Sequence, residues 1–230
     1  MTARTLFVTG TDTEIGKTRI ATAVLRGLVA AGHRAVGYKP VASGCTVTPD
    51  GLRNDDALAL MAAGSPGFTY REINPCAFEP AIAPHIAAAD AGTPIARATL
   101  DASHAHLAGR ADWVVVEGAG GWHVPLGDDW DFADWVAGHG WPTVLVVGMR
   151  LGCVNHAILS ARAIATRTRL LGWVANTLPP RQPRLDQNLS WLASAMPAPC
   201  LARVPMQPPA DHAIDPGAWV DRAEQALSMD

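Results

Sequence analysis

The stretch that decides the fold of this chain runs over residues 6–18. It reads Leu6-Phe7-Val8-Thr9-Gly10-Thr11-Asp12-Thr13-Glu14-Ile15-Gly16-Lys17-Thr18. An apolar strand leads into a loop with two glycines, and the loop passes into a helix. Such a loop turns backbone N–H groups inward at a positive helix end and adds a lysine and a hydroxyl. It therefore predicts a site for a nucleoside triphosphate with Mg²⁺.

The loop departs from the general phosphate-loop pattern at one position. The pattern G-x-x-x-x-G-K-[ST] requires glycine at position 11, where this chain has Thr11, and the glycine stands one residue earlier at Gly10. An ordinary strand–turn–helix with a coincidental Gly-Lys-Thr is the alternative. The strand before the loop and the helix after it favour the phosphate loop. We expect Lys17 to reach the β- and γ-phosphates and Thr18 to contact the metal.

Outward from this loop, short apolar, β-branched runs alternate with helical patterns. Predicted strands are Thr5–Thr9, Ala35–Lys39, Trp113–Glu117, Thr143–Val147, Leu171–Asn176 and Leu201–Val204. Predicted helices include Lys17–Ala31, Ala57–Ala63, one capped by Thr93 with Pro94 at its first position, and one starting at Asp215-Pro216. The pattern predicts an α/β fold: a doubly wound, mostly parallel sheet in a P-loop NTPase-like single domain, residues 1–230.

Composition narrows the function classes. The 230 residues carry a formal net charge of −3 without a basic block, so we expect no nucleic-acid or membrane partner. Apolar runs are shorter than a bilayer span, and the N-terminus has no signal-like segment, which predicts a cytoplasmic location. Cys45, Cys76, Cys153 and Cys200 have no metal-like spacing and are expected to be reduced packing residues. The Pro-rich stretch 65–84 is expected to form an ordered, functional loop.

Three polar residues end predicted strands. Lys39, Glu117 and Asn176 follow apolar runs, and ligands of open α/β sheets bind at the carboxyl ends of the strands. A surface lysine and a solvated carboxylate are the alternatives. We expect Glu117 to hold Mg²⁺ and Lys39 to meet developing anionic charge near the γ-phosphate. Asp55 and Asp56 open a helix, so one carboxylate is expected to favour the helix end and the other to reach the metal.

Several phrases together resemble the dethiobiotin synthetase family. They are Val8-Thr9-Gly10-Thr11-Asp12-Thr13-Glu14-Ile15-Gly16-Lys17-Thr18, Gly37-Tyr38-Lys39-Pro40-Val41-Ala42-Ser43-Gly44, Leu52-Arg53-Asn54 with Asp56-Ala57-Leu58, Val116-Glu117-Gly118-Ala119-Gly120-Gly121-Trp122, Leu151-Gly152-Cys153-Val154-Asn155-His156-Ala157 and Gly172-Trp173-Val174-Ala175-Asn176. They run in order over most of the chain, and the variant loop spacing is this family's own form. Matching is weaker between residues 66 and 109, where Asn74-Pro75 and Pro84-His85 stand out, and it ends after Pro209.

The resemblance implies a homodimer with its active site at the subunit interface, using ATP and Mg²⁺. The substrates would be 7,8-diaminononanoate and CO2. One amine would capture CO2 as a carbamate, ATP would phosphorylate it to a carbamic-phosphoric anhydride, and the second amine would close the ureido ring. No protein nucleophile is needed for this chemistry, so no histidine is assigned a catalytic role.

The resemblance also assigns residues to roles. The catalytic residues would be Lys39, Lys17 and Thr13, and the metal ligands Thr18, Asp56 and Glu117. The nucleotide would be bound by Glu14, Ile15, Gly16, Lys17, Thr18, Arg19, Asp56, Glu117, Gly118, Ala119, Gly120, Asn176, Thr177, Pro205, Met206 and Gln207, with Asn176 at the adenine edge. The diamine substrate would contact Thr13 and Ser43, and its distal carboxylate would meet Gly152, Cys153, Val154 and Asn155 of the neighbouring subunit.

Other P-loop classes are the rival interpretations. A switch ATPase of the partitioning or metal-centre-maturation type usually carries an extra lysine early in the loop, and residues 11–15 contain none. A nucleotide-binding regulatory module without turnover is a second rival. A cobyrinate amidase would need a glutaminase domain, for which this length leaves no room. The choice between enzyme and switch depends on whether a diamine stimulates ATP hydrolysis.

Overall fold

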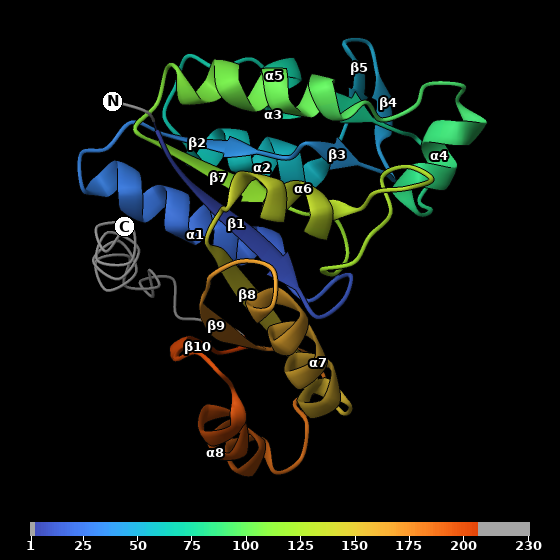
Figure 1. Ribbon diagram of the computed structural model, residues 1–230. Helices are drawn as coiled ribbons and strands as arrows, with labels where there is room; N and C mark the ends of the chain where they lie inside the picture. Colours follow the sequence, from blue (N-terminus) through green and yellow to red (C-terminus); the bar gives the residue numbers. More distant parts are fainter. Residues whose placement is uncertain (1–2, 207–230) are drawn as a thin grey trace.

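The computed structural model describes residues 3–206, and its centre is a parallel sheet (Figure 1). Within these residues the main sheet has six strands in the order β10-β9-β8-β1-β7-β2. Their bounds are β1 (Arg4–Gly10), β2 (Ala35–Tyr38), β7 (Trp113–Glu117), β8 (Thr143–Met149), β9 (Leu170–Thr177) and β10 (Cys200–Val204). Each coincides with a predicted strand to within two residues. The predicted α/β fold with a mostly parallel sheet is confirmed.

Helices cover both faces of the sheet. Their bounds are α1 (Lys17–Ala30), α2 (Asp55–Ala63), α3 (Tyr70–Ile73), α4 (Pro84–Asp90), α5 (Arg97–Ala108), α6 (Phe132–His139), α7 (Cys153–Ala165) and α8 (Leu185–Ala195). One core cluster lies under α1 and α2, and the other lies under α5 to α8. In β7, Val115 belongs to the first cluster and Val114 to the second. Because both faces are buried, the middle of each strand is mostly apolar, and polar residues such as Glu117 and Asn176 stand at or near the strand ends.

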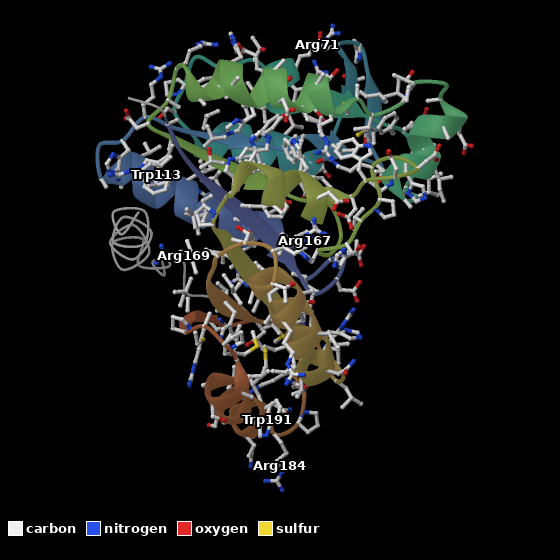
Figure 2. All side chains as sticks on the ribbon, in the orientation of Figure 1. Arg71, Trp113, Arg167, Arg169, Arg184 and Trp191 are labelled. Carbon is white, nitrogen blue, oxygen red and sulfur yellow. The ribbon has the colours of Figure 1, made fainter. Side chains whose placement is uncertain are left out.

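The first cluster also holds one of the large aromatic residues. Trp113 begins β7, is 1 % exposed and packs with the α1 side of the core (Figure 2). Arg4 lies over its ring, with the guanidinium carbon 5.4 Å from the ring centroid. This contact closes the end of the sheet opposite the phosphate loop, because Arg4 and Trp113 are paired at the start of β1 and β7.

The Pro-rich stretch 65–84 is less of a loop than its composition suggests. It contains α3 and the short strand β6 (Cys76–Ala77), which pairs with β3 (Val41–Ala42). A separate hairpin is formed by β4 (Thr46–Thr48) and β5 (Gly51–Arg53). These small elements extend from the carboxyl end of β2 (Figure 1), so they build the wall beside the strand that leads to Lys39.

One predicted helix begins later than its capping signal indicates. The start placed at Thr93-Pro94 is wrong, because α5 begins only at Arg97. Ile95 is buried in the core and Ala96 is extended, which delays the first helical turn, and the Thr93 hydroxyl donates instead to Ala91 O. The helix predicted at Asp215-Pro216 lies outside the described residues. In residues 3–206, no helix has both the length and the apolar character needed to cross a membrane.

The contact between α2 and β2 allows no side chain at Gly37. A Cβ there would lie 2.7 Å from Leu60 Cβ and 3.0 Å from Leu25 Cδ1. We predict that Gly37→Ala lowers the free energy of unfolding by about 1–3 kcal/mol, measured by urea denaturation, because α2 is forced off the sheet.

Gly138 in α6 provides the matched control, because a Cβ there would meet nothing within 4 Å. Gly138→Ala should raise the free energy of unfolding by roughly 0.5–1 kcal/mol. Equal effects of the two substitutions would contradict the tight α2–β2 contact.

Candidate active site

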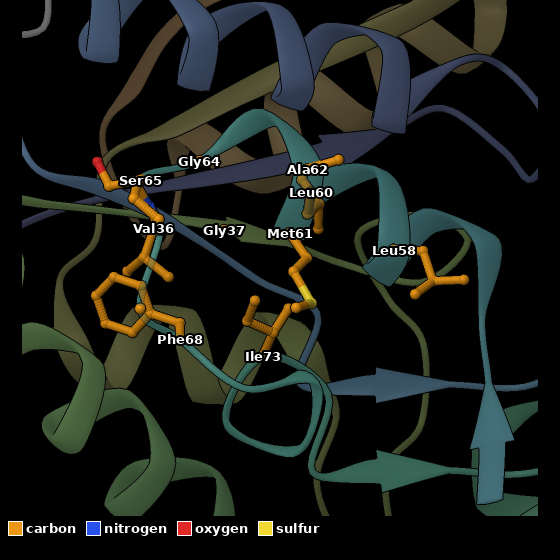
Figure 3. Close-up of a pocket in the computed structure, with 12 residues that line it drawn as sticks. Val36, Gly37, Leu58, Leu60, Met61, Ala62, Gly64, Ser65, Phe68 and Ile73 are labelled. Carbon is orange, nitrogen blue, oxygen red and sulfur yellow. The ribbon is translucent and has the colours of Figure 1, made fainter. Parts of the chain in front are cut away.

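A cleft of about 910 Å³ lies at the carboxyl ends of β1, β2 and β7. It brings together eleven of the predicted site residues: Thr13, Glu14, Gly16, Lys17, Thr18, Lys39, Ser43, Asp56, Glu117, Ala119 and Gly120. A second hollow of about 490 Å³ beside α2 shares no lining residue with it and is lined by uncharged residues such as Leu60, Phe68 and Ile73 (Figure 3). Charged groups therefore mark the first cleft as the candidate site.

The phosphate loop has the backbone of an anion cradle. Glu14 and Gly16 adopt positive φ angles of 58° and 87°, and helix α1 starts directly after Gly16. The ammonium of Lys17 donates to Asp12 O at 2.9 Å, so the lysine folds back over the loop. Ile15 is fully buried, which fixes the middle of the loop to the core. Backbone N–H groups at such a helix start, with a lysine above them, suit a phosphate chain.

Beside this loop, Lys39 lies between two carboxylates. Its ammonium donates to Glu117 Oε1 at 2.7 Å, to Asp56 Oδ2 at 2.9 Å and to Gly118 O at 3.3 Å. The hydroxyl of Thr18 lies 2.6 Å from Asp56 Oδ1 and 2.9 Å from Glu117 Oε1 and donates its single proton to one of them at a time. The cluster joins β2, β7, α1 and α2 at one point.

Charge pairing sets the protonation states in this cluster. Burial alone would lower the pKa of Lys39, but the carboxylates of Glu117 and Asp56 outweigh it and raise the pKa. For Asp56, burial opposes ionisation, yet Lys39 and the Thr18 hydroxyl lower its pKa. Lys39 is thus held as an ammonium and Asp56 as a carboxylate.

Lys17 is in the opposite situation. Burial, followed by repulsion from Lys39, lowers the pKa of Lys17 to about 8. Its direct hydrogen bond goes to a neutral carbonyl rather than to a carboxylate. Lys17 is therefore the ammonium whose charge is poorly compensated in the protein alone, and an anion in the loop would compensate it.

The residues predicted to hold Mg²⁺ fit that ion. Thr18, Asp56 and Glu117 supply a hydroxyl and carboxylate oxygens, the hard ligands that Mg²⁺ prefers. Glu117 Oε2 is buried and has no hydrogen-bond partner, so it keeps a free acceptor beside the phosphate loop. Among residues 3–206, no group of three or more His, Cys, Asp or Glu side chains offers an alternative metal site.

The residues predicted for the nucleotide base lie beyond the cleft wall. Asn176 is 2 % exposed and donates to Ile15 O at 2.8 Å, while its own oxygen accepts from Arg19 at 3.1 Å. Arg19 also donates to Pro205 O at 3.0 Å. These bonds link the phosphate loop to the ends of β9 and β10. Base recognition by Asn176, Thr177, Pro205 and Met206 stays a prediction, and Gln207 lies outside the described residues.

Other predicted residues do not line the cleft. Ile15 is core, and Gly118 contributes its carbonyl to Lys39. The turn Gly152, Cys153, Val154 and Asn155 opens α7, and it is not part of the cleft of its own chain. An ion pair between Arg150 and Asp12 connects the segment before this turn to the phosphate loop.

Some cleft residues were not predicted from the sequence. They are Ala42, Asn54, Ala81, Ile82, Ala83, Pro84, Val124 and Pro125. Asn54, rather than Asp55, caps α2, because its side chain accepts from Ala57 N at 3.2 Å. Its position directly before two aspartates was the available signal. The small and apolar residues carried none of their own, although 81–84 belong to the stretch predicted to be functional.

Comparison with known proteins decides the family. Residues 4–213 match a family model described as an AAA domain. The chain is 55 % identical over 201 residues to the ATP-dependent dethiobiotin synthetase BioD of Pseudomonas paraeruginosa, covering 86 % of this chain and 88 % of the relative. It is 50 % identical over 208 residues to the synthetase of the same name from Xanthomonas euvesicatoria, with coverage of 90 % and 93 %. The chain belongs to the ATP-dependent dethiobiotin synthetase family. The resemblance seen in the sequence motifs is confirmed.

Solved structures with low sequence identity to this chain support its fold. The septum site-determining protein MinD of Pyrococcus horikoshii, complexed with Mg-ADP, matches with a TM-score of 0.60 at 13 % identity, covering 100 % of this chain and 97 % of that one. A ParA family ATPase from Chlorobium tepidum matches with a TM-score of 0.52 at 15 % identity and 99 % coverage of both chains. Both comparisons confirm the P-loop NTPase-like fold. They carry no argument about function, which rests on the site and on the relatives of high identity.

The uncompensated charge of Lys17 predicts a stability effect. Its pKa in the folded protein, about 8, lies below the ordinary value of 10.5, so the unfolded chain binds more protons between these values. Stability should therefore rise as the pH increases from about 8 to 10.5. We predict that Lys17→Met raises the free energy of unfolding at pH 7 by about 1–3 kcal/mol and removes this rise, measured by urea denaturation without ligand.

Lys39→Met is the matched control and should act in the opposite direction. It leaves Glu117 buried without its partner, which costs about 3–5 kcal/mol. If both variants changed stability in the same direction, the contrast drawn between the two lysines would be wrong.

Proposed function

We propose that this protein catalyses the ATP-dependent carboxylation and ring closure of 7,8-diaminononanoate with CO2, giving dethiobiotin, ADP and phosphate. The observation that carries the proposal is the buried Lys39 ammonium beside the phosphate loop in one cleft. The cleft lining contains no histidine or cysteine among the described residues. A substrate that brings its own nucleophiles, two amines and the carbamate formed from one of them, suits such a site.

The residues of the cleft divide the electrostatic work. Lys17 compensates the β- and γ-phosphate oxygens, and Lys39 compensates the charge that develops as a carbamate oxygen attacks the γ-phosphorus. Thr18, Asp56 and Glu117 would hold Mg²⁺, which when bound would neutralise phosphate oxygens and orient the triphosphate. Attack of the second amine on the carbamoyl carbon then releases phosphate and closes the ring. The protein positions these groups and supplies charge.

Substrate and nucleotide contacts follow from position. We propose that Thr13 and Ser43, which line the cleft together with Lys39, contact the carbamate and the diamine end. Glu14 lies beside the phosphates, and Gly118 to Gly120 follow β7 past them. Arg19, Asn176, Thr177 and the segment 205–207 serve the adenosine, with Asn176 at the adenine edge.

The distal carboxylate of the substrate is assigned to the turn Gly152–Asn155 of a second subunit. Three features support this assignment. Helix α7 starts there after Gly152 at φ 94°, no side chain caps it, and Leu151 beside it is 95 % exposed. A free helix N-terminus suits a carboxylate, and an exposed leucine suits a partner surface. We therefore propose a homodimer of single-domain chains, with a cytoplasmic location as the composition predicts.

A partitioning-type switch ATPase is the alternative. MinD and ParA share the fold, but the identity of this chain to dethiobiotin synthetases is several times higher. The loop also lacks a lysine between Thr11 and Ile15. The alternative is not favoured.

We predict that ADP release by the purified protein depends on 7,8-diaminononanoate and bicarbonate. The coupling arises because the phosphoryl acceptor is the carbamate of the substrate. ADP release is measured with and without each component, and ring closure by mass spectrometry of the product. Hydrolysis that ignores the diamine and responds to a protein partner would instead establish the switch ATPase.

Lys39→Gln should keep ATP binding and lose turnover. The glutamine retains a hydrogen-bond donor but no charge, so kcat is expected to fall by about 100-fold or more. ATP affinity, measured by calorimetry, should change little because the phosphate loop is untouched. A near-normal kcat in this variant would remove the charge role of Lys39.

The shared active site predicts complementation between two inactive variants. Asn155→Asp places a negative charge at the helix start proposed to receive the carboxylate, while an acidic residue there is favourable for the helix itself. After Lys39→Gln and Asn155→Asp dimers are mixed and exchanged, half of the dimers are hybrids with one intact site. About a quarter of wild-type activity should return. Mixed samples that stay as inactive as their parents, despite proven exchange, would place the turn in its own chain's site or outside it.

A further inference from the structure

Lys39 is the first residue after β2, and its backbone is held by another part of the chain. Strand β2 ends at Tyr38. The N–H of Lys39 donates to Ile73 O at 2.8 Å, and its carbonyl accepts from Asn74 Nδ2 at 2.7 Å. Residues at the end of α3 thus supply the hydrogen-bond partners of the backbone just beyond β2. The position of the ammonium depends on this connection, because the backbone fixes where the side chain starts.

From Asn74 a chain of hydrogen bonds leads to the helix that carries Asp56. Asn74 is 2 % exposed, and its Oδ1 accepts from the Tyr70 hydroxyl at 2.9 Å. That hydroxyl in turn accepts from Asn54 N at 2.7 Å. Asn54 is the residue that caps α2, and Asp56 lies in the first turn of that helix. The guanidinium carbon of Arg53 lies over the Tyr70 ring, 4.4 Å from its centroid.

These contacts form a closed circuit that includes Lys39 and Asp56. One path runs from the Lys39 carbonyl through Asn74, Tyr70 and Asn54 to α2, and the other is the direct 2.9 Å contact between Lys39 Nζ and Asp56 Oδ2. We propose that Asn74 and Tyr70 are positioning residues, which set the distance between the Lys39 ammonium and the Asp56 carboxylate and thereby the rate of phosphoryl transfer. The link to rate rests on the proposed function, and the geometric part does not.

A purely structural role for the same residues is the competing explanation. Asn74 ends α3, and its N–H donates to Tyr70 O, so it contributes to the helix end by its backbone alone. The side chain bonds no backbone group of α3: its Nδ2 donates to Lys39 O and Cys76 O, and its Oδ1 accepts from the Tyr70 hydroxyl. Substitutions that remove only side-chain hydrogen bonds separate the two roles.

The test uses Asn74→Leu and Tyr70→Phe in the full-length protein. Asn74→Leu keeps the number and branching of the side-chain heavy atoms but neither donates nor accepts, and Tyr70→Phe removes only the hydroxyl between Asn74 and Asn54. We expect kcat to fall by about tenfold to a hundredfold in each, because a small displacement of the reacting groups is costly. ATP affinity should stay within about threefold, because the phosphate loop makes none of these contacts.

Thr69→Ala is the matched control. The Thr69 hydroxyl accepts from Glu72 N and caps the same helix, so its loss weakens α3 without touching Asn74, Tyr70 or Lys39. Its thermal stability should fall while kcat stays within about twofold of wild type. In the double variant of Asn74 and Tyr70, kcat should be no lower than in whichever single variant has the lower kcat, because both residues act through one path.

A second readout needs no substrate. Lys17 and Lys39 are the two lysines of the chain, and both lie in the cleft. Acetylation by N-hydroxysuccinimidyl acetate, followed by peptide mass spectrometry, therefore reports on Lys39 with Lys17 as the internal reference. The ratio of Lys39 to Lys17 labelling rates should rise by several-fold in Asn74→Leu and Tyr70→Phe, and should match wild type in Thr69→Ala.

The outcomes separate the two proposals. Absence of diamine-dependent ADP release in the wild-type protein overturns the proposed function, while a higher Lys39 labelling ratio in the two variants still supports the positioning role. Unchanged labelling ratios in Asn74→Leu and Tyr70→Phe overturn the positioning role, as does a kcat that follows thermal stability equally in these variants and in Thr69→Ala. If Asn74→Leu does not fold, Tyr70→Phe alone supports or overturns the proposal by the same measurements.

Discussion

The ion pair between Lys39 and Glu117 is the interaction on which the site depends. Lys39 is 3 % exposed and Glu117 fully buried, so each buried charge is stabilised by the other at 2.7 Å. The sheet order enforces this contact. Strands β2 and β7 are parallel neighbours with Tyr38 opposite Val116. The residues that follow these two, Lys39 and Glu117, therefore lie side by side. Strand β1 lies on the other side of β7, and the first turn of α1, which follows the loop after β1, adds Thr18 to the same cluster.

Much of this arrangement could be predicted, because the signals are local. A strand buried on both faces is apolar throughout, so a lysine or glutamate that ends it stands out, and parallel strands bring such ends to one edge. Lys39 and Glu117 were found in this way, and Asp56 was found as one of the two aspartates that open α2. The cleft unites the three with Gly16, Lys17 and Thr18. The loop spacing at Gly10 is irregular for P-loops in general, and this local irregularity narrows the family.

The remainder depends on contacts between distant segments, which leave little trace in a single sequence. The start of α5 shifted to Arg97 because Ile95 is drawn into the core, a tertiary effect that outweighs the Thr93-Pro94 capping signal. The side-chain amide of Asn176 is bonded to the phosphate loop and to Arg19, two contacts that its position at a strand end did not indicate. The Asn-Pro dipeptide was the only signal at Asn74 in the sequence. Its bond to Lys39 could not be predicted, because the two residues are 35 positions apart along the chain.

The two lysines of the cleft differ in how far the protein compensates their charge before an anion binds. Lys39 is already neutralised by Asp56 and Glu117, so its charge is positioned in advance and needs no rearrangement when the transferring group acquires negative charge. Lys17 is buried against a carbonyl with its pKa lowered to about 8, and a phosphate chain would restore the charge that burial disfavours. In the proposed function, phosphate binding would therefore depend most on Lys17, whereas Lys39 would act in the step in which charge moves. This division explains why carboxylates surround one lysine and leave the other to the ligand.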